Sequence, residues 1–326
     1  MPFFALFGAP PISYHELLQF NESTPDLITW AAPFMFLCVL VEFGISQYQN
    51  KGYYNRQETW GSIMVGIGNV LISTAIKFLL FGLAVFIYNL LPYRMEFSWW
   101  TFLPCYVLYD FCSYWAHYIS HHQRFWWATH VVHHSAEHYN LTTSFRLSWV
   151  QYFKIVFMLP VFLAGFHPVV FFVVNQVAIL FQFWVHTEYI RRMPAWVELI
   201  FATPSNHRVH HGSQPKYINK NFGATFILWD RWFGTYQPEE EQAIYGITHQ
   251  SESKVNPFVI NFEEYKHILT DVRQAKGLRQ KLFYVFGDPV EIAKKKEGLK
   301  KTRTSSLTEI QDFTDMRKVT EAHFVQ

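Results

Sequence analysis

Long apolar runs constrain this chain more than any other feature. Across residues 27–48 the only charged side chain is Glu42, and across residues 62–91 it is Lys77. An α-helix needs about 20 apolar residues to cross the hydrocarbon core of a bilayer, and both runs exceed that length. Only helices and closed barrels satisfy their backbone polar groups inside a membrane. The runs therefore predict an all-α fold, an integral membrane helical bundle.

Three further apolar segments extend the predicted bundle. Residues 97–116 are interrupted only by Asp110, and residues 149–166 and 168–185 form a pair joined by Gly-Phe-His-Pro. An 18-residue helix rises about 27 Å, which is just enough to cross the hydrocarbon core. A re-entrant hairpin is the alternative for this pair, and it also returns the chain to the side it left. We expect about four to five spans.

The basic residues predict the orientation of the bundle. Residues 1–26 contain no Lys or Arg, so they lack the positive region of a cleavable signal peptide and the first span is expected to be retained. Lys51 and Arg56 lie in the first loop that the positive-inside rule places in the cytosol. The same topology places everything after His186 on the cytosolic side. The expected location is the endoplasmic reticulum in a eukaryote or the inner membrane in a bacterium.

Composition excludes several functional classes. Only 16% of residues are charged and the formal net charge is +2, which argues against a nucleic-acid partner. The three cysteines have no C-x-x-C spacing, which excludes a disulfide framework, a cysteine zinc site and a c-type haem attachment.

Histidines gather in three groups. The spacings i, i+3 and i+4 share one helix face, so each group can direct its imidazoles to a common point. Eight of the 16 histidines lie in these groups, and the predicted topology places all three groups on one side of the membrane. The members are His117 and His121, then His130, His133 and His134, then His207, His210 and His211.

The apolar pair at 149–185 explains how distant groups can meet, because the chain leaves after the second group and returns just before the third. His186, at the end of that pair, becomes a ninth candidate ligand. Imidazole suits Fe, Zn, Cu or Ni. Eight or nine ligands exceed what one ion accepts, so the pattern predicts a cytosolic cap with two metal ions.

Three polar residues are predicted to support this site. Asp110 lies two helical turns before His117, where its carboxylate could hydrogen-bond a ligand imidazole; a wet interface is the alternative. Glu137 and Asn140 follow the second histidine group. They either line the site or belong to a polar surface turn.

The histidine groups belong to a longer series of motifs, which are Asp110-x3-Tyr114-Trp115-x-His117-x3-His121, His130-x2-His133-His134-Ser135, His207-x2-His210-His211, Asn221-Phe222-Gly223 and Trp229-Asp230-Arg231-x-Phe233-Gly234-Thr235. In this order the motifs resemble the fatty acid hydroxylase superfamily, membrane di-iron enzymes that include the sterol desaturases. The resemblance covers roughly residues 97–250. Within the superfamily, EHYNLTTSFR at 137–146 and TPSNHRVHHG at 203–212 are most similar to the branch that contains the alkylglycerol monooxygenases. His138 and Asn206 depart from that branch, which has an acidic residue and a histidine there.

The resemblance implies two ferrous ions and O2 acting on a membrane lipid, by hydroxylation or by desaturation. It implies catalytic-site positions at Glu137 and Asn140. The reductant is tetrahydrobiopterin if the ether-lipid branch is the right one, and otherwise an electron-donor protein or another diffusible reductant, because the sequence shows neither a Rossmann fingerprint nor a cytochrome b5 pattern. The implied iron ligands are His117, His121, His130, His133, His134, His207, His210 and His211, with His186 as a ninth.

Two alternatives remain at the sequence level. A sterol desaturase or another lipid hydroxylase would differ in its product. A membrane metal transporter would hold its ligands near mid-span, whereas these histidines lie beyond the predicted span ends. The expected organisation is membrane spans at 1–96, the di-iron domain at 97–250, a cytosolic helical region at 251–290 and a basic, poorly ordered tail at 291–326.

Overall fold

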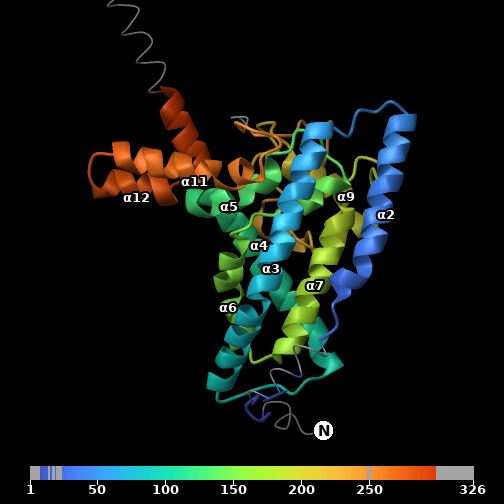
Figure 1. Cartoon of the computed structure of the whole chain (residues 1–326), viewed down its shortest axis with the longest axis vertical. Helices are drawn as coiled ribbons and strands as arrows, with labels where there is room; N and C mark the ends of the chain where they lie inside the picture. The colour runs from blue at the N-terminus through green and yellow to red at the C-terminus, as the bar shows by residue number, and fades with distance from the viewer. Residues whose placement is uncertain (1–7, 14, 17–18, 20–23, 248–250, 299–326) are drawn as a thin grey trace, which may run out of the picture.

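The computed structural model in Figure 1 describes residues 8–13, 15, 16, 19, 24–247 and 251–298. Within these residues every regular element is a helix, and β-pairing is limited to two isolated bridges, Gly8–Arg94 and Phe201–Phe226. The all-α prediction is confirmed for the described part of the chain.

Among the described residues, two helices are long and apolar enough to cross a membrane: α2 (Leu27–Tyr48) and α3 (Arg56–Leu90). They run along the long axis of the molecule together with α7 (Pro168–Trp184) (Figure 1). Large apolar side chains stand outward on α2 and α3; Trp30 is 72% exposed and Leu79 is 70% exposed. A contiguous apolar surface of this kind is costly in water and marks a surface that meets lipid or a partner.

Of the three remaining expected segments, 168–185 corresponds to α7, and the other two differ from the sequence prediction. The expected span over 97–116 corresponds to α4 (Phe102–His122), which begins and ends later than predicted. The 3-10 turn η2 (Trp99–Thr101) leads into it. The expected helix over 149–166 is absent; it is replaced by the 3-10 helix η4 (Gln151–Met158) and the short α6 (Leu159–Leu163). Pro160 starts α6 because proline fits the first turn of a helix, where its missing N–H is not needed. Gly165 turns the chain at φ +80°.

The centre of the bundle is the packing of α4 against η4, α6 and α7. Its buried side chains include Cys105, Cys112, Phe171 and Val174. Tyr109 on α4 donates a hydrogen bond to Asn175 on α7 at 2.8 Å, which satisfies two polar groups within an otherwise apolar contact. This packing fixes the end of α4 relative to the end of α7, where the histidines lie.

Short helices cover one end of the bundle: α5 (Arg124–His134), η3 (Leu141–Phe145), α8 (Ala195–Ile200), α9 (Pro204–His211) and α10 (Leu228–Phe233). A hairpin of α11 (Pro257–Gln274) and α12 (Leu278–Phe286) projects sideways from this end (Figure 1). Residues 289–298 are also helical, and the rest of the predicted tail, 299–326, lies outside the described residues.

Arg124 joins the hairpin to α5. Its guanidinium contacts Glu264 at 2.6 Å and Asp271 at 2.5 Å, and its backbone N–H donates to the carbonyl of Gly287 at 3.0 Å. The side chain is almost completely buried, so these ion pairs are shielded from solvent. The first residue of α5 is thereby held from both its side chain and its backbone.

Candidate metal centre

Three helix segments and one loop position the histidines. Gln123 takes an extended conformation, so α4 ends at His122 and a separate helix, α5, begins at Arg124. Helix α9 starts with Thr203, whose side chain accepts a hydrogen bond from the N–H of Asn206, followed by Pro204 in the first turn. His186 lies just after the end of α7. All nine candidate histidines come together at this end of the bundle.

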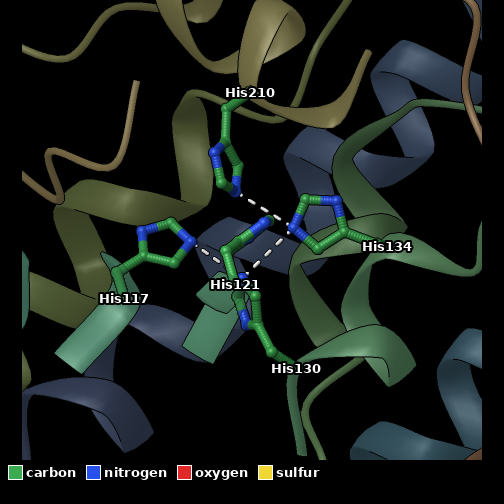
Figure 2. Close-up of side chains that lie close together, drawn as sticks. All are labelled: His117, His121, His130, His134 and His210. Carbon is green, nitrogen blue, oxygen red and sulfur yellow. Dashed lines mark hydrogen bonds between the residues drawn. The ribbon is translucent and has the colours of Figure 1, made fainter. Parts of the chain in front are cut away.

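Figure 2 shows the first group of imidazoles, which come from α4, α5 and α9. The Nε2 atoms of His117 and His130 are 2.7 Å apart, and His134 Nε2 lies 3.1 Å from His130 Nε2 and 3.0 Å from His210 Nε2. One ligating nitrogen from each of five residues lies within 4.8 Å of the others. The five are His117, His121, His130, His134 and His210.

The second group has four members: His133, His186, His207 and His211. His186 Nε2 lies 3.1 Å from His133 Nε2 and 3.0 Å from His207 Nε2. His211 Nε2 closes the ring, at 3.1 Å from His133 and 3.2 Å from His207. These atoms also lie within 4.8 Å of one another.

The two groups divide the sequence motifs in a way that their spacing did not predict. We expected each motif to direct its imidazoles to one point, whereas His133 and His210 each turn to the other group. The i and i+4 pairs stay together, because a full helical turn restores the same direction. His133 and His210 each precede the last histidine of their motif by one residue, and adjacent residues point about 100° apart on a helix.

Backbone carbonyls fix the tautomers of three imidazoles. The Nδ1 atoms of His117, His186 and His210 lie 2.8, 2.7 and 3.0 Å from the carbonyl oxygens of Phe222, Gln182 and Lys220. A carbonyl only accepts, so Nδ1 carries the proton and the Nε2 lone pair points into the centre.

The arrangement fits metal ions better than hydrogen bonding alone. His121 Nε2 is buried without a hydrogen-bond partner among the described residues. Lone pairs that converge at about 3 Å repel one another unless a cation binds them. A nitrogen-only donor set with carbonyl-oriented imidazoles suits transition metals such as iron.

Burial keeps these imidazoles neutral. It lowers the pKa of His186 and of His210 to about 4 each, and it lowers the pKa of His130, His134 and His207 as well. A histidine must be neutral to bind a metal. At neutral pH the site therefore presents its ligands without first losing protons.

Asp110 does not have the role that its spacing predicted. Its fully buried carboxylate accepts hydrogen bonds from the N–H groups of Thr225 and Phe226, at 2.8 and 3.1 Å, and from Trp229 Nε1 at 2.8 Å. In the described structure its hydrogen bonds thus go to the 225–229 segment rather than to a ligand imidazole. The carboxylate is placed by this loop and not by the nearby histidine motif.

A second buried carboxylate holds the preceding part of that loop. Asp230 accepts from the N–H groups of Phe222 and Gly223, both at 2.7 Å. A side chain at Gly223 would place Cβ 2.5 Å from the Phe226 carbonyl oxygen, so only glycine fits. Asp110 and Asp230 together position the carbonyl of Phe222 that receives His117 Nδ1. The Asn-Phe-Gly and Trp-Asp-Arg motifs therefore orient a candidate ligand.

Glu137 and Asn140 lie outside both histidine groups. The Glu137 carboxylate pairs with Lys254 at 2.5 Å. Asn140 caps η3 and donates to the carbonyl of Tyr53 at 2.8 Å. In this structure Asn140 stabilises the turn that follows α5.

Sequence analysis did not identify Glu42 as a supporting residue. Its carboxylate, buried on α2, accepts hydrogen bonds from Tyr54, from Thr187 and from the N–H of Leu141. Thr187 follows the candidate ligand His186, so the long apolar helix α2 is tied directly to the second group. The signal was present in the sequence, since Glu42 is the only charge in its apolar run.

A cavity of about 580 Å³ adjoins the second group. Tyr139 and Tyr245 line it and stack at 4.7 Å between centroids, with an interplanar angle of 12°. Tyr139 also lies 5.2 Å from the ring of His211. Glu137 and Glu188 contribute carboxylates to the lining, and Tyr245 donates to Glu188. The cavity thus combines an aromatic face with hydrogen-bond acceptors.

Comparison with known proteins identifies the class. Residues 102–235, which contain all nine candidate histidines, match the family described as Fatty acid hydroxylase. The chain therefore carries a domain of that family, and the resemblance drawn from the motifs is confirmed.

Individual relatives extend the similarity beyond residues 102–235. The chain is 35% identical to the alkylglycerol monooxygenase of Xenopus tropicalis over 82% of its own length and 60% of the relative's. Against the alkylglycerol monooxygenase of Homo sapiens the identity is 35%, over 83% of this chain and 61% of the relative. The ornithine lipid hydroxylase OlsE of Rhizobium tropici is 30% identical over 44% of each chain. The chain spans about three fifths of the length of the first two relatives. No solved structure matches the chain.

Proposed function

We propose that this protein is a membrane-bound di-iron monooxygenase that uses O2 to hydroxylate a C–H bond of a membrane lipid. The observation that carries the proposal is the division of nine histidines into two converging groups of five and four. Two adjacent nitrogen-rich centres suit a reaction that needs more than one electron. The family match over residues 102–235 supports the same chemistry.

The membrane placement rests on the apolar surface of α2 and α3. We propose a multi-pass protein whose histidine end faces the cytosol, in the endoplasmic reticulum or a bacterial inner membrane. Candidate ligands then lie close to the ends of α4 and α7, where a lipid chain can approach from the bilayer while its headgroup stays at the surface. A metal transporter is less well supported, because the two groups lie at one end of the bundle rather than at mid-span.

The proposed substrate is an alkylglycerol, because two relatives that align with more than four fifths of this chain bear the name alkylglycerol monooxygenase. Hydroxylation of the carbon next to the ether oxygen gives a hemiacetal, which collapses to an aldehyde and glycerol. The second candidate is hydroxylation of another lipid. The similarity to an ornithine lipid hydroxylase favours it, and so do the departures at His138 and Asn206.

In this mechanism the protein supplies a preorganised ligand set. The nine imidazoles would hold two iron ions, which would supply electrons for O2 activation. The carbonyls of Phe222, Gln182 and Lys220 hold three imidazoles in the ligating tautomer. We propose that the cavity at Tyr139 and Tyr245 admits the reductant, with tetrahydrobiopterin as the first candidate, since an aromatic face and carboxylates suit a planar, hydrogen-bonding molecule.

The test combines metal content with product analysis. Protein purified without oxygen in mild detergent is expected to hold two irons per chain and to lose iron in His134→Ala and His210→Ala. His122→Gln is the matched control, since His122 adjoins His121 on α4 but belongs to neither group. Ether lipids, sterols and fatty acids are then assayed with and without tetrahydropterin. A single zinc per chain, or full activity in both alanine variants, would refute the proposal.

A further inference from the structure

Helix α11 carries an apolar stripe in addition to the face that packs on the protein. Its buried residues include Ile260, Ile268 and Asp271. On a different side, Phe258, Phe262 and Leu269 are exposed by 65%, 40% and 49%. Separations of four and seven residues return to the same helix face, so these three side chains form one line.

Helix α12 repeats the pattern. Leu278, Leu282 and Phe286 are spaced by four residues and are exposed by 71%, 48% and 50%. Buried Tyr284 lies off this line and faces the protein. Each helix therefore packs one face on the protein and leaves a second, apolar face free to contact lipid or a partner.

The two stripes border the same side chain. The ring of Phe125 on α5 lies 6.3 Å from Tyr265 and 6.2 Å from Phe286, between centroids. Tyr265 comes three residues after Phe262 and four before Leu269, so it belongs to the α11 stripe. Contact with one aromatic residue places both stripes on the same side of the hairpin.

That side is continuous with the apolar surface of the bundle. Trp149 contacts Phe258 and Phe262, with centroids 5.0 and 6.2 Å away. Phe125 contacts Trp126 at 5.0 Å, and Trp126 contacts Phe157 of η4 at 4.9 Å. These aromatic contacts therefore connect the exposed stripes to η4, and Trp149 also donates a hydrogen bond to the carbonyl of Val65 on α3, the helix that the proposed function places in the membrane.

The turn of the hairpin is basic. Residues 273–281 contain Arg273, Lys276, Arg279 and Lys281 and no acidic residue. Figure 1 shows the hairpin crossing the long axis of the bundle rather than following it. An apolar stripe with flanking basic residues is typical of helices that lie in the plane of a membrane interface.

We propose that the α11–α12 hairpin lies flat on the cytosolic leaflet, with its apolar stripes among the acyl chains and its basic turn at the lipid phosphates. This inference rests on the membrane placement of the proposed function. Because Arg124 joins the hairpin to α5, contact with the leaflet also sets the height of α5 and its three candidate ligands above the bilayer.

Spin-label accessibility tests the proposal on the full chain in vesicles of phosphatidylcholine and phosphatidylglycerol. Leu282→Cys reports on the stripe, and Leu278→Cys repeats the measurement. Gln274→Cys is the control, because Gln274 is exposed on the same hairpin but lies off the stripe. Leu79→Cys reports on α3. The labels are placed in a Cys38→Ala background, since Cys105 and Cys112 are buried.

We expect the labels at 278 and 282 to favour contact with oxygen over a water-soluble nickel complex, about 5–10 Å into the headgroup and acyl boundary. The label at 274 should show the opposite preference. If the labels at 278 and 282 are in water while the label at 79 is in lipid, the hairpin proposal is wrong and the membrane placement stands. If the label at 79 is also in water, the hairpin proposal and the membrane placement are both wrong. Strong dipolar coupling between labels of two chains, with no lipid contact, would show that a second copy covers the stripe and overturn the proposal.

Discussion

Asp110→Asn is the sharpest test of how the candidate ligands are held. One carboxylate oxygen of Asp110 accepts a hydrogen bond from the N–H of Thr225. The other oxygen accepts two, from the N–H of Phe226 and from Trp229 Nε1. An asparagine can keep the two bonds to one oxygen but turns an NH2 group toward the N–H of Thr225. A bond to a charged acceptor contributes about 1.5–3 kcal/mol and a buried unpaired donor costs about 1–3 kcal/mol, so we expect a total loss of about 2.5–6 kcal/mol.

The weakened loop should hold the Phe222 carbonyl and His117 less firmly, and so lower the affinity of the site for metal. Residues that orient a ligand change metal affinity by about 10–100-fold, and an indirect effect should lie near tenfold. Thermal unfolding in detergent and metal retained against increasing chelator measure the two effects. Trp229→Phe removes only one hydrogen bond. Its melting temperature and its metal retention should therefore lie between those of wild type and Asp110→Asn. Wild-type melting and metal retention in Asp110→Asn would refute the reasoning, and equal losses of metal and of membrane-inserted protein would indicate a general structural role.

Three other perturbations probe separate parts of the structure. Chelation of the metal should lower the melting temperature, because it leaves buried imidazole nitrogens converging without a cation; an unchanged melting curve would argue against the site. Arg124→Met should destabilise the protein by about 3 kcal/mol, because it removes a buried guanidinium and leaves Glu264 and Asp271 with only His267 and Lys296 as partners, and metal loss should accompany it; Arg124→Lys should recover part of the melting temperature. Tyr245→Ala removes one ring of the stack beside the cavity and should raise the KM for the reductant more than it lowers kcat, whereas an unchanged KM would place the reductant elsewhere.

Much of the candidate site follows from local helical geometry. The pairs His117 and His121, His130 and His134, and His207 and His211 were recognisable because i and i+4 side chains must project together. His186 was identified from its place at the end of an apolar segment, and it does join the second group. The apolar runs at 27–48 and 62–91 likewise corresponded to α2 and α3.

Other assignments needed the tertiary structure. Spacing placed Asp110 on the face of His117, yet its partners come from residues 225–229, more than 100 positions later. The irregular η4 could not be read from hydropathy, because a short 3-10 segment and a regular helix can have the same composition. Glu42 was visible as a lone charge, but its link to Thr187 depends on how α2 packs against α7.

The sequence alone determined the helical, apolar character of α2 and α3, the choice of nine candidate histidines and the family resemblance, because each depends on residue type and on spacing along one helix. The tertiary structure decided how those histidines divide into five and four, which carbonyls set their tautomers, and that Asp110 and Asp230 hold a loop. It also brought the stripes of α11 and α12 to one side of their hairpin. These features arise from contacts between segments far apart in the chain, and the direction of a side chain across such a contact is set by packing rather than by local periodicity.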